Sequence, residues 1–205
     1  ISDRASCVRP SPTLVVTAKA AKLRSEGKDV IGLGAGEPDF DTPAHIKAAA
    51  IAAIESGFTK YTAVDGIIEL KQAIQNKFKR DNHLDFNLNQ ILVSVGGKHS
   101  CFNLCQALLN AGDEAIIPAT YWVSYPDMVL LAGGVPVIIE SNIKNSFKIT
   151  PVQLEAAITP RTKLLWLNSP SNPSGIAYNL DELKALAEVL KKHPQVMIAT
   201  DDMYE

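Results

Sequence analysis

Residues 164–179 read LLWLNSPSNPSGIAYN, an apolar run that passes directly into a loop rich in proline, serine and asparagine. The apolar run is typical of a β-strand that is buried on both faces of a sheet. A loop that only reversed the chain would not need so many hydrogen-bonding groups beside residues that restrict the backbone. The segment therefore predicts a buried strand followed by a loop that binds a ligand.

Strands and helices alternate on both sides of this segment. Strands are predicted at residues 91–95, 114–120, 135–140, 163–168 and 196–200, and helices at 99–110, 124–132, 151–158 and 180–192. Asn179 and Glu182 have the spacing of a capping box at the start of the last helix. Because several strands are continuous apolar runs separated by helices, the sequence predicts an α/β fold. Its mostly parallel sheet would be covered by helices on both faces, in three layers, α/β/α.

The part of the chain before residue 91 is less regular. The segment VIGLG predicts a short apolar strand at residues 30–33. Thr42 is expected to be the N-cap of an alanine-rich helix with Pro43 at its first position. Apolar residues at helical spacing predict a further helix over residues 65–80 with one face toward a core.

The composition limits the class of protein. The chain has 205 residues, 46% of them hydrophobic, and a net charge of −2 at pH 7. This charge provides no basic surface for nucleic acid or for an anionic membrane. No apolar run approaches the roughly 20 residues of a membrane span, and the start of the chain does not resemble a signal peptide. We therefore expect a cytoplasmic protein with small-molecule partners, and neither nucleic acid nor a membrane among its partners.

The cysteines and histidines favour a reducing compartment and no metal site. Cys101 and Cys105 would lie one helical turn apart in an apolar segment, which favours buried free thiols in a reducing compartment. A disulfide or a metal site is the alternative for these cysteines. The histidines are scattered without metal-ligand spacing, so no metal is expected.

Polar and aromatic groups follow the predicted strands at the edge where α/β sheets bind ligands. These groups are GGKHS at 96–100, YWVSY at 121–125, NSPSNPSG at 168–175 and DDMYE at 201–205. Each has a structural alternative, because paired glycines often follow strands, Trp122 could belong to the core, and Asp201 or Asp202 could cap a helix. Since all of them would lie at one edge, the combination indicates a single ligand.

Pyridoxal 5′-phosphate matches this combination of groups. Its phosphate suits backbone N–H groups at the start of a helix. Its pyridine nitrogen is kept protonated by a fixed carboxylate, and its ring stacks on an aromatic side chain. Asp201 and Tyr204 supply a carboxylate and a phenol three residues apart. The chain lacks the glycine patterns of dinucleotide and P-loop sites, which makes a nucleotide a weak alternative.

Several segments together resemble one family. In order they are AGEPDFDTP, KYTAVDG, VGGKHSCFN, YWVSYPDM, AITPRTK, NSPSNPSG and DDMYE. They resemble class I aminotransferases of fold-type I, and most of all the bacterial aspartate aminotransferases, along essentially the whole chain. The resemblance implies an N-terminal arm and small-domain segment over residues 1–40. Residues 41–205 would form the large domain that binds pyridoxal phosphate, without its C-terminal part.

The resemblance implies roles for individual residues at the end of the sheet. Asn172, the asparagine of N-P-x-G, would bond the 3-oxygen of the cofactor, and Asp201 would pair with the pyridinium nitrogen. Tyr204 completes the D-x-x-Y motif, and Trp122 would stack on the cofactor ring. Asp201 and Tyr204 are therefore the expected catalytic residues, while Trp122 and Asn172 also belong to the expected substrate site.

Further cofactor and substrate contacts are implied in the same way. Gly96, Gly97 and Lys98 match the phosphate loop of the family. Tyr61 resembles the tyrosine that reaches the phosphate of the neighbouring subunit, so the likeness implies a homodimer with shared sites. Gly36 matches a backbone contact to the α-carboxylate of the substrate.

The sequence departs from the family pattern at two points. The Schiff-base lysine and the arginine that binds the substrate α-carboxylate would both follow Glu205, and no lysine present matches the former. We therefore expect these 205 residues to be inactive by themselves. At Arg9 some relatives carry a lysine associated with prephenate as a second substrate. Arginine keeps the charge but has a different geometry, which puts dual specificity in doubt.

The resemblance implies transamination between L-aspartate and 2-oxoglutarate, giving oxaloacetate and L-glutamate. A lyase or synthase of the same fold is one alternative, because the motifs bind the cofactor and do not select the reaction. An aminotransferase-like effector module of a transcription regulator is another. The VRPSP arm so near Ile1 argues against the DNA-binding domain that such a regulator would carry. The sequence leaves the choice between aspartate, prephenate and aromatic substrates open.

Overall fold

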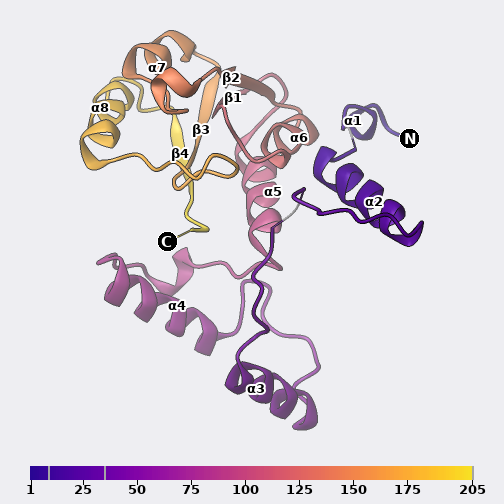
Figure 1. The fold of residues 1–205 in the computed structure, drawn as a ribbon. Coiled ribbons are helices and arrows are strands. Elements are labelled where there is room, and N and C mark those ends of the chain that lie inside the picture. Colours follow the sequence, from indigo (N-terminus) through magenta and orange to yellow (C-terminus); the bar gives the residue numbers. More distant parts are fainter. Residues whose placement is uncertain (9, 35, 205) are drawn as a thin grey trace. The chain divides into compact units, whose positions relative to one another are not determined.

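The computed structural model describes residues 1–8, 10–34 and 36–204 (Figure 1). The chain forms two compact units, one made of Ile1–Ala18 and Gly96–Glu205 and the other of Lys19–Val95. Neither boundary falls at residue 40, and the assignment of residues 41–205 to one cofactor domain stays a prediction. The predicted ligand edge lies within the first unit.

A parallel sheet forms the centre of the first unit. Its strands are β1 (Glu114–Pro118), β2 (Val135–Ile139), β3 (Thr162–Asn168) and β4 (Met197–Asp201). They pair in the order β2-β1-β3-β4, and every pair is parallel. All carboxyl ends therefore lie at one edge, where Asn168 of β3 is directly opposite Asp201 of β4. The predicted parallel sheet is confirmed.

Helices cover both faces of this sheet (Figure 1). They are α5 (Gly97–Leu108), α6 (Ser124–Leu131), α7 (Pro151–Ala157) and α8 (Leu180–Leu190). Ile117 and Leu164 pack against α5 and α6, whereas their neighbours Ile116 and Leu165 pack against α7 and α8. The side chains of a strand alternate between its two faces, so the apolar residues of β1 and β3 pack into both cores. The predicted three-layer α/β/α arrangement is confirmed.

The predicted capping box at the start of α8 is present. The side chain of Asn179 accepts from Glu182 N at 2.9 Å, and Asn179 N donates to the Glu182 carboxylate at 2.8 Å, which completes the predicted capping box.

Cys101 and Cys105 are free and buried in α5. The predicted buried free thiols are thus confirmed. Burial raises the pKa of both thiols to about 11, so they remain neutral in the core.

The remaining elements lie in the N-terminal half of the chain and in the loops. They are α1 (Asp3–Ser6), α2 (Pro12–Ser25), α3 (Ala44–Glu55), α4 (Ile68–Asp81), and two short 3₁₀ helices, η1 (Leu88–Gln90) and η2 (Ile143–Asn145). The predicted helix over 65–80 is thus present as α4. None of the helices in the described part of the chain combines the length and apolar character of a membrane span.

Two predicted strands, at 30–33 and 91–95, are wrong, because both segments are irregular. An apolar run becomes a strand only when its backbone pairs with a neighbouring strand. Val93 N donates instead to the carbonyl of Asp65 at 3.0 Å, in a loop of the same unit. Ile31 and Leu33 are exposed and also lack the burial that would stabilise a central strand.

The predicted N-cap of α3 is also wrong by one residue. The helix begins at Ala44, with Pro43 as its N-cap and without a side-chain capping bond. Pro43 has φ −52° and ψ 141°, so its ψ is extended and the helical turn starts after it. Thr42 therefore lies too early to bond the first free N–H groups of the helix.

A buried carboxylate at the start of β1 yields a prediction about stability. The Glu114 side chain is only 5% exposed and is ion-paired with Arg161. It accepts hydrogen bonds from the hydroxyls of Thr159, at 2.5 Å, and Thr162, at 3.3 Å. The bond from Thr159 is the main cause that holds the pKa of Glu114 below its ordinary value, with Arg161 adding to it.

Replacing Glu114 by glutamine should lower the free energy of unfolding at pH 7 by about 1.5–3 kcal/mol, the range for hydrogen bonds to a charged group. A lowered native pKa means that the stabilisation is full above the unfolded pKa and is lost as the pH falls through the native pKa. The difference between wild type and Glu114→Gln should therefore shrink in acid. Urea denaturation at a series of pH values tests this. Glu188→Gln, in which an exposed pair to Lys191 is lost, is the matched control and should change little.

Candidate functional site

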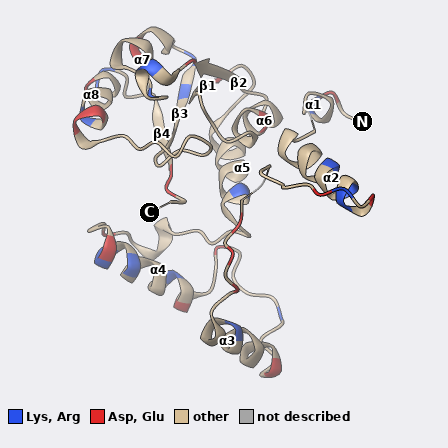
Figure 2. Cartoon of the chain, in the orientation of Figure 1, with Lys and Arg blue, Asp and Glu red and all other residues tan. Residues whose placement is uncertain are grey.

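A cavity of about 190 Å³ lies at the carboxyl edge of the sheet. Its walls come from the start of α5, the segment before α6 and the start of α6, the end of β3 with its loop, and the end of β4 with the residues after it. The lining residues are Gly97, Lys98, Trp122, Tyr125, Asn168, Asn172, Asp201, Met203 and Tyr204. In Figure 2, the chain is red, the colour of Asp and Glu, where β4 ends, and α5 carries blue, the colour of Lys and Arg. The parallel strands thus bring the predicted groups together at one edge.

The start of α5 can hold a phosphate group. Gly96 has φ +103°, a conformation that other residues rarely adopt. The first helical bonds run from the N–H groups of His99 and Ser100 to the carbonyl of Gly96. The N–H groups of Gly97 and Lys98 precede these bonds and lie at the positive end of the helix dipole. A Cβ atom added to Gly97 would meet nothing within 4 Å, so there is space beside this backbone for an anion.

Aromatic rings form one wall of the cavity. Trp122 is half-buried, and its ring meets the ring of Tyr125 edge to face at 5.5 Å between centroids. Tyr125 in turn stacks on Trp166 at 4.8 Å. The Nζ atom of Lys98 lies 4.9 Å from the centre of the Trp122 ring. Trp122 therefore contacts the core and lines the cavity as well, so the two interpretations of its position are compatible.

The end of β4 is held by two residues that the sequence analysis did not identify. Tyr125 donates its hydroxyl proton to Asp201 Oδ2 at 2.5 Å, and Asn168 Nδ2 donates to the backbone carbonyl of Asp201 at 2.7 Å. Tyr125 is 2% exposed. Burial is the first cause that raises the pKa of Tyr125, and the bond to Asp201 is the second, so the phenol stays neutral and acts as a donor.

The loop after β3 is stabilised by its own polar groups. Asn172 N donates to Asn168 Oδ1 at 2.7 Å, and the hydroxyl of Ser171 donates to the carbonyl of Thr120 at 3.2 Å. Gly175 has φ +71° and donates its N–H to the carbonyl of Ser171 at 2.7 Å. The serines and asparagines of NSPSNPSG thus hold the loop in a shape that leaves Asn172 at the cavity.

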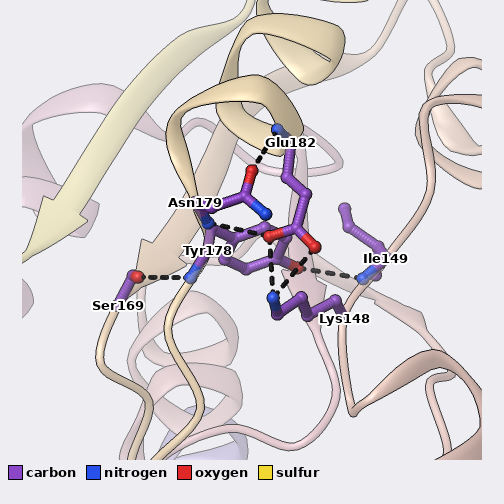
Figure 3. A network of polar contacts seen from close by, with 6 residues as sticks. All are labelled: Lys148, Ile149, Ser169, Tyr178, Asn179 and Glu182. Atoms are coloured by element: carbon purple, nitrogen blue, oxygen red, sulfur yellow. Dashed lines mark hydrogen bonds and ion pairs between the residues drawn. The ribbon is translucent and has the colours of Figure 1, made fainter.

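The far end of the same loop is bound to α8 and to the segment before α7 (Figure 3). Tyr178 N donates to the hydroxyl of Ser169 at 3.0 Å, and the hydroxyl of Tyr178 accepts from Ile149 N at 2.9 Å. Lys148 pairs with Glu182 at 2.7 Å, and this bond is the main cause that lowers the pKa of Glu182. Both ends of the loop are therefore fixed, which restricts the position of Asn172.

The other predicted site residues have different outcomes. Tyr204 lines the cavity and is 50% exposed, and Met203 beside it was not predicted. Gly36 and Tyr61 lie in the unit Lys19–Val95, where the Tyr61 side chain is fully exposed. Their expected contacts with substrate and partner stay predictions. Arg9 lies outside the described residues.

Tyr125 and Asn168 carried weak signals in the sequence. Tyr125 ends the aromatic segment YWVSY, which was predicted to lie at the ligand edge, but Tyr125 itself was given no role there. Asn168 is the last residue of the predicted strand and precedes the proline-rich loop. A polar residue at the carboxyl end of a central strand is itself a signal for a site. In both cases the bonding partner, Asp201, is distant in sequence.

Comparison with known proteins identifies the family. A family model described as "Aminotransferase class I and II" matches residues 28–205. The chain is 64% identical over its full length to an aspartate/prephenate aminotransferase of Nitrosomonas europaea, covering 52% of that protein. It is 62% identical to one of Cereibacter sphaeroides, covering 51% of it. The chain thus spans about half the length of the curated relatives that it matches.

Solved structures agree with this match. The aspartate aminotransferase of Rhizobium meliloti superimposes with a TM-score of 0.95 at 51% identity, over 100% of this chain and 51% of that one. The Thermus thermophilus aspartate aminotransferase with maleate gives a TM-score of 0.95 at 47% identity, over 100% of this chain and 53% of that one. With the family match over residues 28–205, these likenesses establish that the chain belongs to the class I and II aminotransferases.

Proposed function

We propose that the protein containing this chain transfers the amino group of L-aspartate to 2-oxoglutarate, giving oxaloacetate and L-glutamate. The cavity at the sheet edge carries this proposal, because a helix start, an aromatic ring, an amide, a carboxylate and a phenol converge there. The names of the relatives, aspartate/prephenate and aspartate aminotransferase, support aspartate as the donor.

The cofactor of this family is pyridoxal 5′-phosphate, and the residues of the cavity suit it. The free N–H groups at the start of α5, with Lys98, would bind its phosphate. Trp122 would lie against the ring, Asn172 would donate to the ring 3-oxygen, and Tyr204 would add a phenol on the same side. When bound, the cofactor supplies a carbonyl group that exchanges with amines and a ring that accepts electrons.

Asp201 would keep a proton on the ring nitrogen. Its Oδ2 atom is already bonded to the neutral hydroxyl of Tyr125, and its backbone carbonyl is bonded to Asn168. A carboxylate fixed in this way favours the protonated, cationic form of that nitrogen, because the opposite charge is close.

The remaining roles extend to the substrate and to a second subunit. The backbone at Gly36 would contact the α-carboxylate of the substrate. Tyr61 would reach the phosphate in the neighbouring subunit of a homodimer, and its fully exposed side chain is available for such a contact. The buried free thiols of Cys101 and Cys105 agree with a reducing compartment, which supports a cytoplasmic location.

A half-reaction tests the proposed function. The full-length protein, loaded with pyridoxal phosphate, is mixed with L-aspartate in the absence of any keto acid. We expect one equivalent of oxaloacetate per cofactor and loss of the visible absorbance of the cofactor. Addition of 2-oxoglutarate should restore the absorbance and release L-glutamate. Turnover to other products would favour a lyase or synthase, and a protein that binds no cofactor would contradict the proposal.

Prephenate is a second candidate amino acceptor. The relatives from Nitrosomonas europaea and Cereibacter sphaeroides are both named aspartate/prephenate aminotransferases, and they match the whole chain. The same assay with prephenate in place of 2-oxoglutarate should then restore the cofactor absorbance. If only 2-oxoglutarate restores it, the arginine at position 9 is the first residue to exchange for lysine.

A further inference from the structure

We propose that Asn168 is a positioning residue that sets the separation between Asn172 and Asp201, the residues expected to bond the 3-oxygen and the ring nitrogen of the cofactor. This inference rests on the proposed function. It assigns no contact with the reacting atoms to Asn168. Its role would be to bind the loop after β3 to the end of β4.

The carboxamide of Asn168 is bonded at both of its polar atoms. Oδ1 accepts from Asn172 N at 2.7 Å, and Nδ2 donates to the carbonyl of Asp201 at 2.7 Å. The amide group is planar and rigid, so these two bonds fix Asn172 and Asp201 relative to each other. One half-buried side chain thus connects a loop to a neighbouring strand at the wall of the cavity.

Asparagine is the side chain that suits this position. Asn168 and Asp201 are opposite each other in the β3–β4 register, so the short side chain reaches across to the next strand. Aspartate has the same shape, but an ionised carboxylate offers two acceptors and no donor, and it would face the carbonyl of Asp201. Alanine would leave the N–H of Asn172 without this acceptor.

The side chain of Asp201 is oriented by a different residue. Tyr125 bonds Oδ2 of the carboxylate, whereas Asn168 bonds the backbone carbonyl. Loss of Asn168 should therefore shift the whole end of β4 relative to the loop, even with the Tyr125 bond intact. The affinity for the cofactor should therefore fall, and its ring should be misaligned.

Asn168→Asp and Asn168→Ala in the full-length protein test the proposal. The dissociation constant of pyridoxal phosphate, measured by spectroscopic titration, should rise about 10-fold in each variant. Alanine loses both hydrogen bonds, whereas aspartate loses the donor to Asp201 and places a negative charge against its carbonyl. At saturating cofactor, kcat should also stay about 10-fold below wild type, because the two ring contacts remain misaligned. A merely structural role would let kcat recover once the site is full.

Asn142→Ala is the matched control. Asn142 accepts from Lys144 N at 2.9 Å in η2 and is not among the residues that line the cavity. This variant loses a comparable side-chain bond and should keep the wild-type dissociation constant and kcat.

Three outcomes bear on the inference. Wild-type affinity and wild-type kcat at saturating cofactor in Asn168→Asp would overturn it, while the proposed function would stand on the wild-type half-reaction. If Asn168→Ala does not fold, the aspartate variant, which keeps the volume, decides the question. A wild-type protein that does not bind pyridoxal phosphate would overturn both proposals together.

Discussion

Asp201→Asn should reduce kcat/KM for L-aspartate by about 10³-fold, within the usual range for removing a group that controls a proton. Asparagine keeps the size of the side chain and can still accept from the hydroxyl of Tyr125, which lies 2.5 Å from Oδ2. What it removes is the negative charge. Without that charge the ring nitrogen loses its proton more readily, and the ring accepts electrons poorly. Steady-state kinetics of the full-length protein measure this effect.

The neighbouring carboxylate provides a close control. Asp202 accepts from the hydroxyl of Thr200 at 2.8 Å and is absent from the described lining of the cavity. Asp202→Asn removes the same charge one position away and should leave kcat/KM within about twofold of wild type, as is usual for an exposed position. Equal losses in the two variants would mean that the overall charge of this edge matters and that Asp201 has no specific partner.

Loss of the Asp201 carboxylate should also change the absorption spectrum of the bound cofactor. In Asp201→Asn the pKa of the ring nitrogen of the bound cofactor should be lower than in wild type, because a nearby carboxylate stabilises the protonated form of the nitrogen. A variant with low activity but an unchanged pH titration would place the defect elsewhere, for example in substrate binding. The absorption spectrum at several pH values separates the two cases.

Leu154→Ala should lower the free energy of unfolding by about 3 kcal/mol, near the middle of the range for large-to-small changes in a core. Leu154 is 0% exposed and packs in the cluster between the sheet and the helices α7 and α8. Alanine removes apolar contacts and leaves a cavity that the surrounding strands cannot fill. Urea denaturation of the cofactor-free protein measures this loss.

Val152 on the same helix is the matched position. Its side chain is 79% exposed, so Val152→Ala removes almost no buried surface. The expected change is within about 0.5 kcal/mol, as for other exposed positions. If Leu154→Ala were equally harmless, α7 would not belong to the core of this unit, and the three-layer description would fail.

Local patterns in the sequence determined most of the layered unit. Apolar runs separated by helical periodicity predicted β1 to β4 and the helices between them, because burial on two faces leaves a continuous apolar signature. Asn179 and Glu182 predicted the start of α8, since a capping box involves only neighbouring residues. The chemistry after each strand also identified the cavity, because parallel strands deliver their carboxyl ends to the same edge.

Tertiary structure decided what depends on distant partners. The apolar runs at 30–33 and 91–95 are indistinguishable from strands in sequence, yet a strand forms only where another strand pairs with it. Tyr125 and Asn168 are bonded to Asp201, which lies 76 and 33 residues further along the chain. No local pattern encodes such pairs, because only the tertiary structure brings their atoms to within 2.5 and 2.7 Å.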